Sequence, residues 1–327
     1  MNASHRPLRL GTRRSQLAMA QSGGVARQVE RLTGRPVELV EITTYGDVSR
    51  EALASIGGTG VFVSALRDAL LAGEIDFAVH SLKDLPTAQP EALTLAALPR
   101  RADPRDVLVS RAGLPFEELT ADPARPARIG TGSPRRTAQL NAWARSLGRT
   151  IETVAIRGNV DTRIGYVRSG ELDAVVLAAA GLHRIGRAGE ISEPLSPDTV
   201  LPAPGQGALA VECAASNTAL AAQLAGLDDP HTRMAVTAER TLLATLEAGC
   251  SAPVGAYADL LTGDDGQTVT EVRLRGVVGT TDGSALVQLS TTGPVPASAG
   301  EAAAMGRTLA DEMLAKGAAG LMGERAH

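Results

Sequence analysis

The feature that most constrains the fold is the regular alternation of short apolar segments with helical patterns through the first 200 residues. The short segments are expected to be strands, and the longer amphipathic stretches between them are expected to be helices. Strands are expected over residues 8–12, 37–44, 76–82, 93–98, 107–110, 127–131, 151–156 and 174–179, and helices over 15–32, 61–72, 134–147 and 160–168. Such alternation predicts an α/β fold with parallel sheets that are covered by helices on both faces.

The pattern changes beyond residue 228, where a helix over 232–246 is followed by three expected strands and a second helix over 297–314. The three strands are expected over residues 254–260, 268–276 and 285–290, and they predict a small α+β domain with an antiparallel sheet. A further strand over 208–213 is placed to return to the sheet of the first lobe.

Two segments rich in proline, 99–104 and 201–207, have the stiffness expected of crossings between lobes. We therefore expect two lobes like those of periplasmic binding proteins with a cleft between them, and a separate C-terminal domain. The expected boundaries are 1–102 with 203–227 for the first α/β lobe, 103–202 for the second α/β lobe, and 228–327 for the C-terminal α+β domain.

Composition excludes several classes of protein. Residues 1–200 carry a formal charge of +3 and residues 201–327 carry −7, which gives the net charge of −4. A net acidic chain with seven aromatic residues is not typical of a nucleic-acid binder. No apolar stretch is long enough for a membrane helix, and none resembles a signal peptide. With two cysteines and no clustered histidines, we expect a reduced cytoplasmic protein without a metal site.

Several arginines follow closely after the ends of expected strands. Arg135 and Arg136 follow the helix start at Ser133-Pro134, where the helix dipole disfavours cations, so an anion is expected to compensate them. Arg157, Arg163 and Arg184 are placed at the same edge of the sheet. Several guanidinium groups without matching acids predict a ligand that carries many carboxylates or phosphates.

Three further residues, Asp84, Lys83 and Cys250, are candidates for a catalytic or binding role. Asp84 follows a strand in the segment His80-Ser81-Leu82-Lys83-Asp84-Leu85-Pro86. Its carboxylate could exchange protons with a bound substrate or stabilise positive charge on it, or it could cap the turn or form a surface ion pair with Lys83. Lys83 is one of only two lysines beside thirty arginines. Cys250 lies in a Gly-Cys-Ser loop and is either a nucleophile or an inert thiol, whereas Cys213 is expected in the core.

Seven motifs in order resemble the porphobilinogen deaminase (hydroxymethylbilane synthase) family, from residue 8 to the last helix. They are Arg13-x-Ser15 with Gln21, the segment 80–86, Gly130-Thr131-Gly132-Ser133-Pro134-Arg135-Arg136, the segment 157–163, Ala180-Gly181-Leu182-His183-Arg184, Pro204-Gly205-Gln206-Gly207 and Gly249-Cys250. The resemblance implies a transferase of porphyrin and haem biosynthesis that joins four porphobilinogen molecules head to tail. It releases four ammonia molecules and gives the linear tetrapyrrole hydroxymethylbilane.

The resemblance also implies a role for each matching residue. A dipyrromethane cofactor is attached by a thioether to Cys250, and Asp84 is the catalytic carboxylate. The residues that match the family's carboxylate-binding positions are Arg13, Ser15, Lys83, Thr131, Ser133, Arg135, Arg136, Arg157, Arg163 and Arg184. Further contacts are expected from Gln21, Ser81, Asn159 and Gln206. The family is monomeric, and its product passes to the next enzyme of the pathway.

The chain departs from the family pattern at three positions. Thr59, in the glycine-rich loop 56–60, stands where the family usually has lysine, which puts in doubt the role of this loop in closing over substrate carboxylates. Pro134 replaces a leucine-like residue at a position where a helix tolerates proline. Asp161 adds an acid that is expected to pair with Arg157 or Arg163.

Two alternatives explain part of the sequence. A solute-binding protein with two α/β lobes would fit residues 1–227, but it gives Cys250 no role and usually requires an export signal. The effector domain of a transcription regulator would require a helix-turn-helix segment, for which the sequence before residue 8 has no room.

Overall fold

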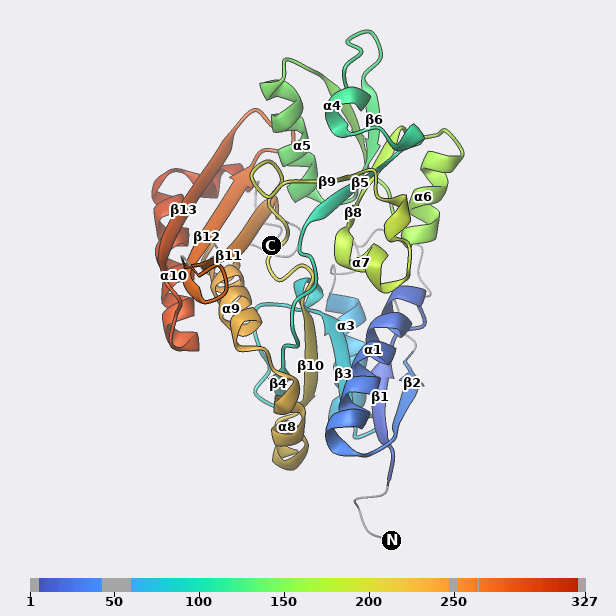
Figure 1. Ribbon diagram of the computed structural model, residues 1–327, viewed down its shortest axis with the longest axis vertical. Coiled ribbons are helices and arrows are strands. Elements are labelled where there is room, and N and C mark those ends of the chain that lie inside the picture. Colours follow the sequence, from blue (N-terminus) through green and yellow to red (C-terminus); the bar gives the residue numbers. More distant parts are fainter. Residues whose placement is uncertain (1–5, 43–59, 247–251, 264, 323–327) are drawn as a thin grey trace. The chain divides into compact units, whose positions relative to one another are not determined.

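A computed structural model describes residues 6–42, 60–246, 252–263 and 265–322 (Figure 1). The chain divides into two compact units, Met1–Ala102 with Gly207–Arg233 and Asp103–Gln206 with Met234–His327. The C-terminal domain expected from the sequence thus shares a unit with the second lobe.

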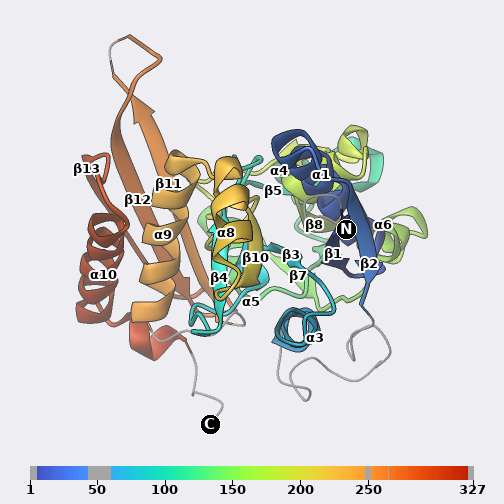
Figure 2. The same cartoon turned by 90° about the horizontal axis from the view of Figure 1, so that it is seen from below.

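The first unit contains a five-stranded sheet in the order β2-β1-β3-β10-β4. Its strands are β1 (Leu8–Thr12), β2 (Val37–Glu41), β3 (Phe77–Ser81), β4 (Leu93–Ala97) and β10 (Leu209–Ala214). The helices are α1 (Gln16–Thr33), α3 (Gly60–Leu71) and α8 (Thr218–Leu224). Helices α1 and α8 share one hydrophobic core with the sheet, while α3 packs into a second core on the opposite face, as Figure 2 shows.

The second unit contains another five-stranded sheet, in the order β7-β6-β8-β5-β9. Its strands are β5 (Asp106–Ser110), β6 (Ala127–Gly130), β7 (Ile151–Val154), β8 (Ala174–Ala178) and the short β9 (Glu193–Pro194). Helices α4 (Phe116–Leu119) and α5 (Pro134–Ser146) share one core with this sheet, and α6 (Val160–Arg168) and α7 (Ala179–Arg184) share the other.

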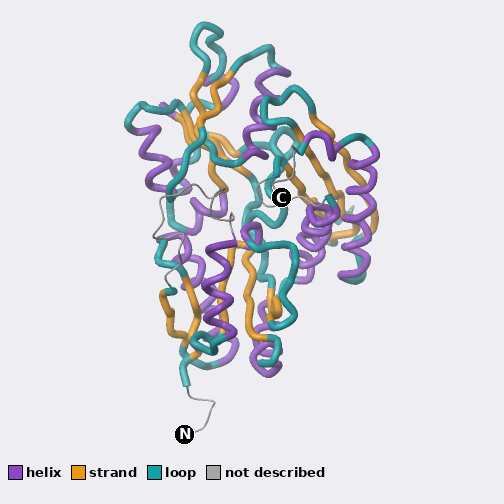
Figure 3. Tube along the Cα trace, turned by 180° about the vertical axis from the view of Figure 1, so that it is seen from behind, coloured by secondary structure: helices purple, strands orange, loops and turns teal. Residues whose placement is uncertain are grey.

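The remaining part of the second unit is an antiparallel sheet of β11 (Val254–Thr262), β12 (Val269–Gly279) and β13 (Leu286–Pro294). Helices α9 (Pro230–Thr245) and α10 (Ala299–Ala315) supply the core residues that cover it, and Figure 3 shows this sheet from behind. The order helix, three strands, helix is the one that the sequence predicts. The proposed domain boundaries themselves stay a prediction.

The expectation of parallel sheets is confirmed for β2-β1-β3 and for β7-β6-β8, but it is wrong for β10 and β5. Strand β10 runs antiparallel to β3 and β4, and β5 runs antiparallel to β8 and β9. Strand β5 follows the proline-bearing crossing 99–104, and β10 follows the crossing 201–207. After each crossing the chain enters the sheet from the opposite end. The expected return of the strand over 208–213 to the first sheet is confirmed by β10.

The described helices include none with the length and apolar character that crossing a membrane requires.

Candidate functional site

In the first unit, the segment with Lys83 and Asp84 forms a single 3-10 turn at the carboxyl end of the inner strand β3. The buried side chain of Leu82 anchors the turn, and the Leu82 N–H donates to the carbonyl of Ala208 at 3.0 Å. The Leu85 N–H closes the turn on the Leu82 carbonyl at 3.2 Å. Lys83 and Asp84 are therefore held partly exposed at the end of a rigid strand.

Arg13 and Ser15 lie at the same edge of that sheet. Strands β1 and β3 pair in parallel, so their carboxyl ends point the same way and carry Arg13–Ser15 and Ser81–Asp84. Ser15 caps α1, because its hydroxyl accepts a hydrogen bond from the Ala18 N–H at 3.3 Å. Gln21, on the same helix, is buried. The sheet therefore brings together the first two motifs of the sequence, Arg13-x-Ser15 and the segment 80–86.

In the second unit, the loop after β6 carries Thr131 and Ser133. The Thr131 N–H donates to the carbonyl of Val154 at 2.9 Å, and its hydroxyl oxygen accepts from the Ser133 N–H at 3.2 Å. Ser133 is the N-cap residue of α5, as predicted, but its hydroxyl makes no capping hydrogen bond. Pro134 occupies the first turn, which confirms that the helix tolerates it.

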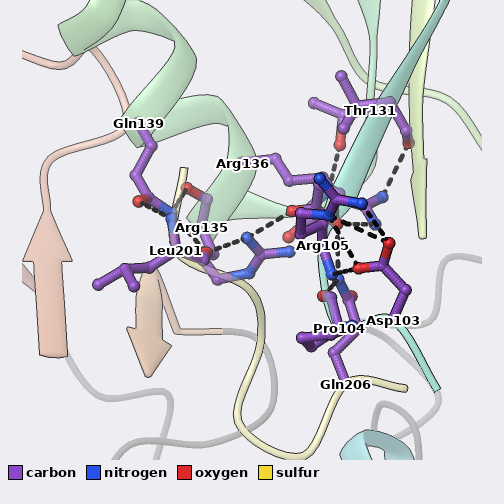
Figure 4. A network of polar contacts seen from close by, with 12 residues as sticks. Asp103, Pro104, Arg105, Thr131, Arg135, Arg136, Gln139, Leu201 and Gln206 are labelled. Atoms are coloured by element: carbon purple, nitrogen blue, oxygen red, sulfur yellow. Dashed lines mark hydrogen bonds and ion pairs between the residues drawn. The ribbon is translucent and has the colours of Figure 1, made fainter. Parts of the chain in front are cut away.

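Arg135 and Arg136, which are labelled in Figure 4, are both buried. They share one buried carboxylate, that of Asp106. Arg135 Nη1 lies 2.7 Å from Asp106 Oδ2, and Arg136 Nη2 lies 2.7 Å from Oδ1. Gln206 donates from Nε2 to the same Oδ1 at 2.8 Å. The expectation that these arginines lack a matching acid is therefore wrong, because Asp106 compensates one of their two positive charges at the helix start.

The charges of this cluster and its burial shift the pKa values of Asp106 and Arg135. Burial alone would raise the pKa of Asp106, but the positive charges of Arg135 and Arg136 outweigh burial and hold this pKa far below its ordinary value. Burial lowers the pKa of Arg135, an effect that the charge of Asp106 opposes and that of Arg136 reinforces. One negative charge thus stabilises two positive charges in a region that water scarcely reaches.

Arg157, Asn159 and Arg163 follow β7. Asn159 caps α6, since its Oδ1 accepts from the Thr162 N–H at 2.9 Å, and Arg163 Nε donates to the Gly158 carbonyl at 2.9 Å. The pKa of Arg163 is lowered by burial and then by the nearby charge of Arg136, so these two guanidinium groups act on each other. Arg157 is exposed in the same loop.

Asp161 does not behave as expected from the sequence, because its ion pair is with Arg187. Arg187 reaches α6 from the segment after α7, which sequence spacing alone does not indicate. Asp161 therefore pairs with a residue outside the proposed carboxylate-binding set.

Arg184 ends α7, the helix that follows β8. Burial lowers its pKa to about 10. Strands β6, β7 and β8 run in the same direction, so Thr131, Arg157 and Arg184 follow the carboxyl ends of three neighbouring strands. A lowered pKa at an arginine means that its charge has lost part of its hydration, which an anionic ligand would offset.

Two predicted features, Cys250 and residues 56–59 of the glycine-rich loop, lie outside the described residues. Helix α9 ends at Thr245 and β11 begins at Val254, so these elements flank Cys250 on either side in the second unit. Cys213 is fully buried in β10, which confirms that it belongs to the core. Among the described residues no His, Cys, Asp or Glu cluster could hold a metal ion.

Sequence reasoning missed Asp106, which joins the arginines of the second unit. The signal was present, because Asp106 directly precedes the apolar run Val107-Leu108-Val109 and becomes the first residue of a buried strand. A charged side chain in such a strand needs a buried partner. The distant partners Arg135 and Gln206 are what the sequence does not reveal.

Comparisons with known proteins cover nearly the whole chain. The family model "porphobilinogen deaminase, dipyromethane cofactor binding domain" matches residues 8–222, and "porphobilinogen deaminase, C-terminal domain" matches residues 233–315. Porphobilinogen deaminase 1 of Streptomyces avermitilis is 77% identical over 99% of this chain and 100% of its own length. Porphobilinogen deaminase of Thermobifida fusca is 54% identical over 95% of this chain and 94% of its own. Among solved structures, the periplasmic VFT2 domain of Bordetella pertussis BvgS matches at a TM-score of 0.40 and 18% identity, over 68% of this chain and 87% of that one.

Proposed function

Because the chain belongs to the porphobilinogen deaminase family, we propose that it is a hydroxymethylbilane synthase. It condenses four porphobilinogen molecules head to tail, releases four ammonia molecules, and forms the linear tetrapyrrole hydroxymethylbilane for porphyrin and haem biosynthesis. The observation that carries this proposal is the match to porphobilinogen deaminase 1 of Streptomyces avermitilis at 77% identity over 99% of this chain and 100% of that protein.

The charge of the proposed binding residues suits such a substrate. Porphobilinogen carries two carboxylates, so each added unit increases the negative charge that the protein must bind. In the second unit, Arg135 and Arg136 share a single acid, and Arg163 is close enough to Arg136 for its pKa to respond. This surplus of guanidinium groups supports the binding of a ligand with several carboxylates.

The same surplus fits a dipyrromethane cofactor, which we propose is attached through a thioether to Cys250. When bound, this group supplies the pyrrole to which the first substrate is joined. The proposed carboxylate ligands in the second unit are Thr131, Ser133, Arg135, Arg136, Arg157, Arg163 and Arg184, with further contacts from Asn159 and Gln206. The elements that precede and follow Cys250 in the sequence, α9 and β11, contribute to the same compact unit as these residues, which supports the proposal.

Asp84 is the proposed catalytic residue. Positive charge develops on the substrate as ammonia leaves, and a carboxylate fixed at the end of β3 lowers the energy of that charge. It can also hold the proton that moves at the pyrrole nitrogen. Arg13, Ser15 and Lys83 are proposed to bind substrate carboxylates from the same edge of the first sheet, with further contacts from Gln21 and Ser81.

We propose that the enzyme acts in the cytoplasm as a monomer and passes its product to the next enzyme of the pathway. A chain with two cysteines cannot build a framework of disulfides, which is consistent with a reducing compartment.

Intact mass and activity test this function together. The purified wild-type chain should be heavier than its sequence by one dipyrromethane unit and should convert porphobilinogen to hydroxymethylbilane. Cys250→Ser should lose both the added mass and the activity, because the thioether cannot form. Asp84→Ala should keep the fold and the added mass but lose activity by about 10²-fold or more, because a positioned carboxylate is absent.

Cys213→Ala is the matched control, since Cys213 is buried in β10. It should retain the added mass and the activity. An active wild-type chain without added mass would contradict the role of Cys250, and a pure chain that leaves porphobilinogen unchanged would overturn the function.

A further inference from the structure

Asp106, the first residue of β5, has a fully buried carboxylate that contacts two other segments of the second unit. Its Oδ1 accepts from Arg136 Nε at 3.1 Å, from Arg136 Nη2 at 2.7 Å and from Gln206 Nε2 at 2.8 Å. Its Oδ2 lies 2.7 Å from Arg135 Nη1. Its partners Arg135, Arg136 and Gln206, which are labelled in Figure 4, come from the start of α5 and from the second crossing, so the carboxylate joins β5 to both.

Each of the two guanidinium groups is held at a second point by a backbone carbonyl. Arg136 Nη1 donates to Val176 in β8 at 2.8 Å, and Arg135 Nη1 donates to Leu201 at 2.5 Å. Gln139, one helical turn beyond Arg135, also donates to the Leu201 carbonyl at 3.0 Å. A planar guanidinium fixed both by a carboxylate and by a carbonyl on another element has a defined direction for its other N–H groups.

The cluster of Asp106, Arg135 and Arg136 carries one more positive charge than negative charge, so a further anion is needed to neutralise it. Asp106 contributes one negative charge against the two positive charges of Arg135 and Arg136. Burial and, to a smaller extent, the charge of Arg136 lower the pKa of Arg163, so Arg136 also acts on a guanidinium outside this pair. A second acid at this place would cancel the surplus, whereas a neutral residue in place of Asp106 would leave two buried cations side by side.

We propose that Asp106 is a positioning residue for the reaction. It sets the direction in which Arg135 and Arg136 meet the carboxylates of the growing oligopyrrole, and it leaves one of their two charges for that ligand. This inference rests on the proposed function. It adds a residue that acts through the arginines and does not itself contact substrate.

The test compares Asp106→Asn with the matched variant Asp103→Asn in the holoenzyme. Asp103 lies three residues earlier and is more exposed, and its carboxylate pairs with its neighbour Arg105. Asp106→Asn should raise the KM for porphobilinogen about tenfold or more, since misdirected guanidinium groups lose a bidentate contact. The kcat should change less than the KM, and Asp103→Asn should keep both constants.

A second variant, Asp106→Glu, keeps the charge but moves the carboxylate by one methylene. It should give a KM between those of wild type and Asp106→Asn. Kinetics are normalised to the fraction of chain that carries dipyrromethane, measured by intact mass, so that loss of folded enzyme does not enter the KM. If Asp106→Asn yields no folded protein, a KM for Asp106→Glu at least threefold above wild type supports the proposal.

A merely structural role for Asp106 would lower the melting temperature of these variants and leave the KM of the folded enzyme within twofold of wild type, which would overturn the proposal. Failure of the proposed function is a different result, because the wild-type enzyme itself would then leave porphobilinogen unchanged.

Discussion

At the scale of single residues, Glu212 is a buried carboxylate of the first unit. It lies in β10 with no exposed surface and accepts from Arg67 Nη2 at 2.9 Å and from Gln89 Nε2 at 3.1 Å. His80 Nε2, on the neighbouring β3, lies 3.2 Å from the other oxygen of Glu212. Burial alone would raise the pKa of Glu212, but its interactions with His80 and Arg67 outweigh burial and lower this pKa to about 2.

Glu212→Gln should therefore lower the free energy of unfolding by about 3–5 kcal/mol near neutral pH, because it leaves a cation without its buried partner. The folded pKa of Glu212 lies below the ordinary carboxyl value, so its contribution is complete above pH about 4.5 and is lost as pH falls toward 2. The stability difference between wild type and Glu212→Gln should shrink over that interval. Urea titrations followed by far-UV circular dichroism at several pH values measure it.

The control is Glu91→Gln, which changes an exposed carboxylate in the same unit. Its unfolding free energy should stay within about 0.5 kcal/mol of wild type. A Glu212→Gln deficit that stays constant from pH 5 to pH 3 would contradict the link to this carboxylate's titration.

At the scale of elements, α10 approaches α9 so closely that glycine is required where they meet. A Cβ atom at Gly306 would lie 2.4 Å from the carbonyl oxygen of Ala238 and 3.0 Å from the backbone nitrogen of Leu242. Both neighbours are backbone atoms of α9, which cannot rotate away as a side chain does. The close approach buries Leu309 and Met313 of α10 in the core of the C-terminal sheet.

Gly306→Ala should destabilise the protein by about 1–3 kcal/mol, because the added methyl group pushes two helices apart. Gly300→Ala, in the first turn of the same helix, meets nothing closer than 3.7 Å and should be neutral or slightly stabilising. Thermal unfolding of the two variants beside wild type distinguishes packing from helix propensity. Equal melting temperatures for both variants would contradict the close approach.

The sequence predicted the elements well because local signals define them. The helix over 160–168 and the strand over 8–12 agree with α6 and β1 at both ends, and Asn159 caps α6 with a residue type that favours this position. The direction of β5 and β10 was missed, since strand direction depends on where the chain enters the sheet. The pairing of Asp106 with Arg135 was missed for the same reason, because the partners are brought together only by the folded sheet.

At the scale of the whole molecule, residues 103–206 and 234–327 form one compact unit. The carboxylate of Glu239 in α9 accepts from the Gly205 N–H at 2.7 Å and from the Ala258 N–H in β11 at 2.9 Å. Helix α5 reaches the turn after β12, where Asn141 Nδ2 donates to the Thr281 carbonyl at 2.8 Å. These contacts predict that the second lobe and the C-terminal sheet unfold together.

Trp143 makes this prediction measurable, because it is the only tryptophan and lies in α5, stacked on Phe116 with ring centroids 3.8 Å apart. Glu239→Gln weakens a buried link that Trp143 does not touch, and it should lower the melting midpoint reported by Trp143 fluorescence by several degrees. Circular dichroism should show the same decrease for this unit. A fluorescence midpoint that stays unchanged while the circular dichroism midpoint falls would mean that the C-terminal domain unfolds by itself.

The turn that carries Asp84 depends on the place where the chain passes from one unit to the other. The first unit resumes at Gly207, whose φ of 86° is a conformation that glycine adopts readily, and the next carbonyl, that of Ala208, accepts the hydrogen bond from Leu82. A torsional change at Gly207 therefore displaces the acceptor on which the Asp84 turn rests. Through this one backbone hydrogen bond, the orientation of the Asp84 turn is tied to the conformation of the chain just after Gly207.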